Sequence, residues 1–142
     1  MKQEVTISIE GRQSFPGSEP EAVCTRTRGT LEDRGEAGVV LSYQEGEDSG
    51  LEGAVTTLRV EPGQVVMERT GTLSSRMVFE EGREHRCAYA TPYGTIGMTV
   101  RTRKLHAQLN SGGGEVNIDY DLELDGAGTG RHALYLQVRP TR

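Results

Sequence analysis

The sequence is poor in the residues that mark a disulfide scaffold or a membrane protein. Its 142 residues include two cysteines, two phenylalanines and no tryptophan. Cys24 and Cys87 stand far apart and outside any CxxC pattern, so we expect two buried free thiols in a reducing cytoplasm. No stretch approaches the roughly 18 consecutive apolar residues of a membrane span, and no apolar signal segment follows the first residues. These absences predict a cytoplasmic protein without a membrane partner.

The chain also carries too little positive charge for a protein that binds nucleic acid. Its 16 lysines and arginines are outnumbered by 21 aspartates and glutamates, and the net charge is -5. Binding to a phosphate backbone draws most of its affinity from clustered cations, so we expect no nucleic-acid partner. The pairs Arg26/Arg28 and Arg101/Arg103 place two arginines on one face of a strand, where we expect salt pairing with neighbouring strands.

Apolar residues make up only 34% of the chain, but their order indicates a folded core. They alternate with polar residues, as in Val5–Glu10, where valine and isoleucine alternate with threonine, serine and glutamate. This period of two is typical of strands with one buried face. No window of about 11 residues carries the pattern of an amphipathic helix. In a barrel of such strands only every second residue need be apolar, so the low apolar share is expected.

The alternating segments are separated by short breaks that are rich in glycine. Breaks such as Glu61–Gly63 and Glu81–Gly82 are too short for a parallel crossover, so consecutive strands must pair antiparallel. Closing this meander into a barrel removes its two open edges. We therefore predict an all-β, antiparallel up-and-down barrel of about 8–10 strands that forms one domain over residues 1–142. The expected strands are Val5–Glu10, Ala22–Leu31, Val39–Tyr43, Val55–Val60, Val65–Thr70, Arg76–Glu80, Arg86–Ala90, Thr95–Thr102, Leu105–Leu109, Val116–Leu124 and Ala133–Val138.

The last two of these segments give the clearest assignment of faces. One side of the segment Val116–Leu124 carries Val116, Ile118, Tyr120, Leu122 and Leu124. The other side carries an acidic stripe of Asp119, Asp121 and Glu123. In the next strand His132 lies on an apolar face, and Arg131 and Arg139 lie on the opposite face, where they can pair with the stripe. Glycines in or beside strands are candidates for bulges or close packing, namely Gly29, Gly38, Gly53 and Gly97.

No catalytic or metal-binding pattern has the spacing that its chemistry requires. Alternate carboxylates of the acidic stripe lie about 6.6 Å apart, too far for convergent coordination, and Glu45–Gly50 lacks the residue order of a calcium loop. Gly126–Gly130 precedes a strand, whereas a phosphate loop opens a helix. His85 and Cys87 share a face without the ligand spacing of a zinc site, and His132 alone does not predict a haem. We therefore expect no catalytic residue, no metal and no cofactor, and the sequence argues against an enzyme.

Unusual residues are densest between Arg69 and Gly94. Arg69 shares a face with Val65 and Met67, which leaves two alternatives. Its guanidinium either lies inside the barrel with a paired acceptor or ends the strand and reaches solvent. The acceptors considered for it are Tyr43, Glu80 and Tyr89. The segment Thr91–Gly94, with proline second and glycine last, fits a turn.

These residues also carry a resemblance to a known family. The motifs are Val5-Thr6-Ile7-Ser8-Ile9-Glu10-Gly11, Leu41-Ser42-Tyr43-Gln44-Glu45, Gly50-Leu51-Glu52-Gly53, Thr56-Thr57-Leu58, Arg69-Thr70-Gly71, Met77-Val78-Phe79-Glu80-Glu81-Gly82, Tyr89-Ala90-Thr91-Pro92-Tyr93-Gly94 and Ile118-Asp119-Tyr120. In this order they resemble the YwiB-like family, small bacterial proteins of unknown function with a calycin-like or lipocalin-like β-barrel. The resemblance covers nearly the whole chain, implies an up-and-down barrel in the cytoplasm and brings no catalytic motif. Gln44 and the pair Leu31-Glu32 depart from the family pattern.

We expect a non-enzymatic module that holds a small ligand inside the barrel. Arg69 is the expected anchor for an anionic or carbonyl group. The residues expected near it are Tyr43, Glu80, Tyr89 and Tyr93. The alternative is an interaction or structural protein with a barrel filled by side chains, which acts through its surface or as a homodimer. A third class, an enzyme, would require a site assembled from distant strands.

Overall fold

The chain folds into a closed antiparallel β-barrel. The computed structural model describes residues 2–14, 19–44, 53–71, 74–125 and 128–141, and this part of the chain contains ten strands. They are β1 (Lys2–Ser14), β2 (Glu21–Asp33), β3 (Val39–Gln44), β4 (Val55–Glu61), β5 (Gln64–Thr70), β6 (Ser74–Phe79), β7 (Glu84–Thr91), β8 (Gly94–Asn110), β9 (Gly113–Leu124) and β10 (Gly128–Pro140). Each strand pairs with the next, and β1 pairs with β10 to close the barrel. The predicted all-β meander barrel is confirmed.

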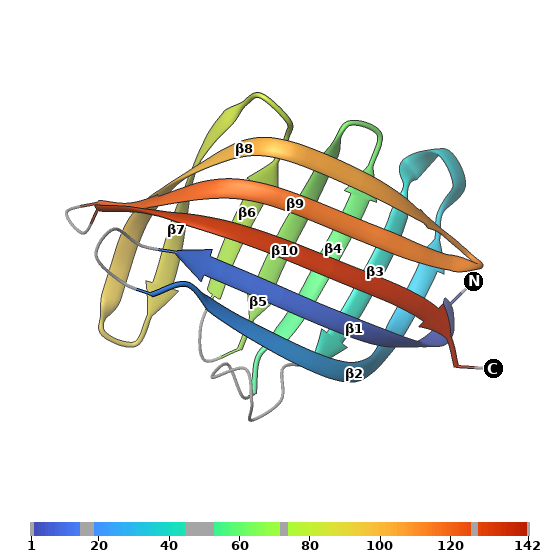
Figure 1. Ribbon diagram of the computed structural model, residues 1–142. Helices are drawn as coiled ribbons and strands as arrows, with labels where there is room; N and C mark the ends of the chain where they lie inside the picture. Colours follow the sequence, from blue (N-terminus) through green and yellow to red (C-terminus); the bar gives the residue numbers. More distant parts are fainter. Residues whose placement is uncertain (1, 15–18, 45–52, 72–73, 126–127, 142) are drawn as a thin grey trace.

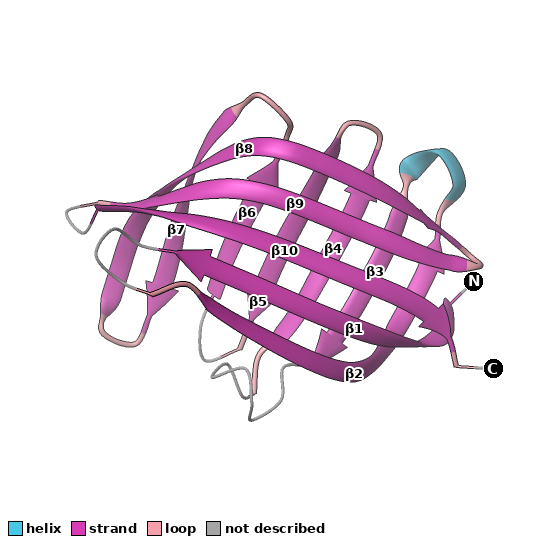
Figure 2. Ribbon diagram, viewed as in Figure 1, coloured by secondary structure: helices cyan, strands magenta, loops and turns pink. Residues whose placement is uncertain are grey.

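The strands form two crossing walls. Figure 1 shows the long strands β8, β9, β10, β1 and β2 in front of the shorter strands β3 to β7, which cross behind them. A turn of 3-10 helix, Gly35–Ala37, connects β2 to β3 (Figure 2). The chain ends lie close together, and the amide of Thr141 donates a hydrogen bond of 3.2 Å to the carbonyl oxygen of Glu4. Across the described ranges, no helix has the length and apolar character needed to cross a membrane.

Strand β8 differs from the sequence-based prediction. We expected separate strands at Thr95–Thr102 and Leu105–Leu109, but β8 runs through both and pairs with β9 from Met98 to Asn110. A bulge between Thr102 and Lys104 shifts the register by one residue. The apolar alternation therefore changes parity at this point, which looks like a strand break in the sequence although the backbone continues.

One end of the barrel interior is filled with apolar side chains. The side chains of Ile7, Leu31, Leu41, Leu58, Val65, Phe79, Ile118 and Leu136 are completely buried there. They come from both walls and alternate with outward polar residues, as expected for strands with one buried face. Gly29 permits close packing of β2 on β3, because a Cβ at this position would overlap the carbonyl oxygen of Ser42.

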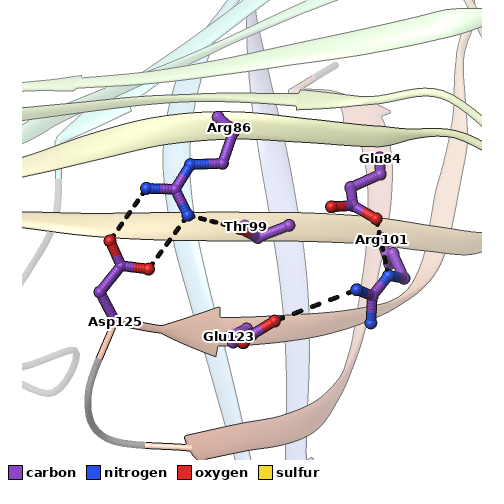
Figure 3. Close-up of polar contacts among 6 residues, drawn as sticks. All are labelled: Glu84, Arg86, Thr99, Arg101, Glu123 and Asp125. Carbon is purple, nitrogen blue, oxygen red and sulfur yellow. Dashed lines mark hydrogen bonds and ion pairs between the residues drawn. The ribbon is translucent and has the colours of Figure 1, made fainter.

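The outer face of β7, β8 and β9 carries a ladder of ion pairs. Figure 3 shows its members Glu84, Arg86, Thr99, Arg101, Glu123 and Asp125. Arg101 Nε lies 2.9 Å from Glu84 Oε2 on β7, and Arg101 Nη2 lies 4.0 Å from Glu123 Oε2 on β9. Arg103 of β8 approaches Asp121 of β9 at 3.7 Å. Among the described residues, Asp121 and Glu123 of the acidic stripe therefore pair with Arg103 and Arg101 of β8. Within this same part of the chain, Arg131 and Arg139 do not make the predicted ion pairs, although Arg131 stands opposite Asp121 in the β9–β10 register.

Candidate functional site

Two rows of inward-facing residues meet at the other end of the barrel interior. The back row runs across β2 to β6, where neighbouring strands place directly opposite one another Gly29, Tyr43, Thr56, Arg69 and Ser75. The front row runs across β8, β9, β10 and β1 and comprises Thr102, Tyr120, His132 and Gln13. Both rows share the strand parity of the apolar core, so their side chains point into the barrel. The interior is therefore polar at this end.

Arg69 provides the positive charge of the back row. It is half-buried, and its Nε donates a hydrogen bond of 3.3 Å to Thr56 Oγ1, which orients the guanidinium. Thr56 is fully buried, and the side chain of Tyr43 is 5% exposed. Ser75 Oγ, beside Arg69 in the row, is buried and has no hydrogen-bond partner within the described part of the chain. This row therefore offers a fixed cation and a buried hydroxyl to a molecule in the interior.

Tyr120 and His132 form the aromatic part of the front row. Their rings stack with a centroid distance of 5.2 Å and an interplanar angle of 11°. Burial raises the pKa of Tyr120, and the charge of Arg69 opposes this rise, so the two walls interact electrostatically. Burial lowers the pKa of His132 against the opposing charge of Asp121. At neutral pH both rings are uncharged, and Tyr120 keeps its phenolic proton.

A cavity of about 260 Å³ opens to solvent at this end of the barrel interior, where Arg69 of the back row faces residues of the front row. It is lined by Gly11, Arg12, Gln13, Glu21, Val23, Arg69, Tyr120, His132, Ala133 and Leu134. Exposed Arg12 and Glu21 lie at its rim, whereas Tyr120 reaches it from the core side. Gly11 contributes space, because a Cβ at this inward position would meet no atom within 4 Å. The volume is below the usual range for drug-sized ligands, so the cavity suits a small molecule.

Larger hollows exist, but they are formed mainly by the outer face of the barrel. One of about 560 Å³ follows β2 and β3 past Arg28 and Ser42. Another, of about 330 Å³, lies over β1, β9 and β10 between Glu10, Asn117 and Tyr135. Most of their lining side chains, such as Arg28, Ser42 and Glu10, have the outward strand parity, although Gly29 and Tyr43 of the back row also border the first hollow. We therefore place the candidate site in the smaller interior cavity.

The structure brings together part of the predicted site. Arg69 and Tyr43 lie in the back row, and Tyr89 pairs with Ser75 in the backbone register, although its side chain lies outside the described atoms. Tyr93 lies in the β7–β8 turn and is 99% exposed.

Glu80 is not placed beside Arg69. It follows the end of β6, roughly 16 Å along the strand from Ser75 at about 3.3 Å per residue. Its Oε1 lies 3.0 Å from His85 Nε2. Strand register, which determines this separation, was not part of the prediction.

Tyr120 and His132 were not predicted as site residues. Their signal was present, because each is a polar residue on the apolar face of an alternating strand. The alternation within each strand does not reveal the β9–β10 register, and it is this register that places the two rings directly opposite each other.

The histidines and cysteines do not gather around a common point. No group of three or more histidine, cysteine, aspartate or glutamate side chains that could hold a metal ion occurs among the residues whose placement is described. The cysteines are free thiols, but the prediction that both are buried is wrong. Cys24 is exposed on β2 and Cys87 is half-buried, where burial raises its thiol pKa.

Comparison with known proteins agrees with the barrel architecture. A curated relative from Bacillus subtilis (strain 168), the uncharacterized beta-barrel protein YwiB, is 26% identical over 125 residues, which cover 87% of this chain and 86% of the relative. The crystal structure of ywiB protein from Bacillus subtilis matches with a TM-score of 0.87 at 22% identity, over 99% of this chain and 94% of that chain. The resemblance seen in the sequence is therefore confirmed. The family model described as Domain of unknown function (DUF1934) matches residues 7–136, and the chain belongs to this family.

Proposed function

We propose that this protein is a non-enzymatic binding module that holds one small anionic molecule in the interior cavity. The observation that carries the proposal is the position of Arg69, whose guanidinium lines the cavity opposite two uncharged rings. A cation in a partly desolvated site binds a carboxylate or phosphate more strongly than it would in water. Ser75 Oγ and the Tyr120 hydroxyl add hydrogen-bonding groups on the same inner surface.

The packed apolar end of the barrel holds a residue of this site in place. Phe79 is completely buried and contacts Tyr120 edge to face, with ring centroids 4.8 Å apart. Tyr120 therefore stands on the apolar core and faces the cavity with its position set by packing. A site preorganised in this way needs little rearrangement to bind its ligand.

The test is a titration of the full chain with hexanoate and hexylamine, followed by amide NMR shifts. Hexanoate is expected to shift residues around the cavity, and hexylamine, of opposite charge, is not. Arg69→Leu should weaken hexanoate binding by at least about tenfold, because a charge-assisted hydrogen bond is lost. Arg76→Leu is the matched control, since Arg76 is exposed on the neighbouring strand β6.

A second variant tests the location of binding. Gly11→Leu should fill the empty space at Gly11 and prevent hexanoate binding while the barrel remains folded by circular dichroism. Native mass spectrometry of freshly purified protein would reveal a ligand retained from the host. Unchanged binding by Arg69→Leu, or no response to hexanoate together with no bound mass, would overturn the proposal. The latter result favours the alternative of a protein that acts through its surface or as a homodimer.

We also propose two narrower properties. The calycin-like or lipocalin-like class of the barrel rests on the sequence resemblance, and a location in the cytoplasm rests on the resemblance and on two cysteines outside any disulfide pattern. Small barrels of the calycin-like class can enclose one ligand, which supports the binding proposal.

A further inference from the structure

The ligand class follows from an aromatic column that leads from the core to the cavity. The aromatic column consists of Phe79, Tyr120 and His132. Phe79 meets Tyr120 edge to face at 60°, and Tyr120 stacks on His132 at 11°. His132 is the member of the column on β10, and it lines the cavity together with Tyr120. A flat ring entering the cavity therefore meets aromatic surface that packing already holds in place.

The space beside the aromatic column suits a thin, flat group. Gly11 of β1 stands opposite Leu134 of β10, one inward position from the pair Gln13/His132. The absence of a side chain at Gly11 leaves this position open, and Leu134 and Val23 provide apolar sides. A ring placed there contacts apolar carbon at its edges and the aromatic column nearby.

The charge of Arg69 determines the polar end of such a molecule. Arg69 lines the same cavity, and its hydrogen bond to Thr56 fixes the orientation of the guanidinium. The planar fork of an arginine matches the two oxygens of a carboxylate. On the basis of the proposed function, we infer that the cavity binds a small planar aromatic carboxylate, with its carboxylate at Arg69 and its ring against His132.

The inference is tested with two acids of equal charge and similar size, benzoate and cyclohexanecarboxylate. Only benzoate is flat and aromatic. Isothermal titration of the full chain is expected to show benzoate binding about threefold to tenfold more tightly, the gain typical of an aromatic pair. His132→Phe should keep this preference, and His132→Leu should abolish it. His106→Leu is the matched control, because His106 is exposed on β8.

An NMR measurement on the wild-type protein tests the inference without relying on variants that could misfold. Bound benzoate should produce ring-current shifts at the amides of Gly11 and Leu134 that cyclohexanecarboxylate does not produce. Equal affinities and equal shift patterns for the two acids would overturn the inference. If both acids then still depended on Arg69, the proposed function would stand without it. If neither acid bound, the proposed function would fail as well.

Discussion

Arg86 and Asp125 form a two-pronged ion pair that passes over Gly97. Arg86 Nη1 lies 3.0 Å from Asp125 Oδ1, and Arg86 Nη2 lies 2.9 Å from Asp125 Oδ2 (Figure 3). Arg86 Nη1 also donates to Thr99 Oγ1 at 2.8 Å. A Cβ at Gly97 would overlap Asp125 Oδ2 and lie 3.0 Å from Arg86 Nη2. The missing side chain at Gly97 therefore allows β7 to be tied to the end of β9 across β8.

Gly97→Ala should displace this ion pair. The hydrogen bonds from Arg86 hold the pKa of the Asp125 carboxyl below its ordinary value, so this pKa should rise in the variant. Carboxyl carbon NMR titration measures it directly. Gly11→Ala is the control, because its new methyl group meets no atom within 4 Å. An Asp125 pKa that is equally low in both variants would contradict the steric argument.

Asp125→Asn should change how stability depends on acid pH. Because the folded pKa of Asp125 is lowered, first by its hydrogen bonds from Arg86, its contribution is present above the ordinary aspartate value of about 3.9. This contribution is lost as the pH falls through the lowered folded pKa. Urea unfolding should show the wild type more stable at neutral pH, with the difference vanishing in strong acid. The effect should be small and weaken with salt, since both side chains are more than half exposed.

His132 should make the barrel less stable below neutral pH. Burial lowers its folded pKa, so the unfolded chain takes up a proton near pH 6.5 that the folded chain resists. Stability is therefore full above about pH 6.5 and falls as the pH drops toward the lowered folded value. Urea unfolding at several pH values should show a smaller loss for His132→Phe than for the wild type. His106→Phe is the control. If it reduced the acid-dependent loss of stability as much as His132→Phe, the loss would not be due to His132.

Leu58→Ala should destabilise the filled end of the barrel by about 2–5 kcal/mol, because this side chain is completely buried and its removal leaves a cavity. Ile96→Ala, at a position that is 41% exposed, should cost clearly less. Chemical denaturation of both variants measures the difference. Equal losses would show that the core is less tightly packed at Leu58 than the burial indicates.

The sequence predicted the barrel well because alternation and short connections are local properties. The alternation along Val116–Leu124 assigned Tyr120 to the core face, and parity in β5 placed Arg69 on the face of Val65 and Met67, which left open whether its guanidinium lies inside the barrel. The β8 bulge was missed because a one-residue register shift interrupts the alternation in the same way as a loop does.

The sequence by itself determined the alternation of the strands, their inner and outer faces and their antiparallel order. Only the tertiary structure decided which inward residues meet. Register between strands moved Glu80 away from Arg69 and placed Tyr120 against His132. Closure of β1 on β10 then placed Gly11 opposite Leu134 and next to the pair Gln13/His132, where these residues line the cavity. The alternation within a strand can be read from that segment alone. The register between strands and the closure of the barrel depend on how all the strands pack together, so they cannot be read from any single segment.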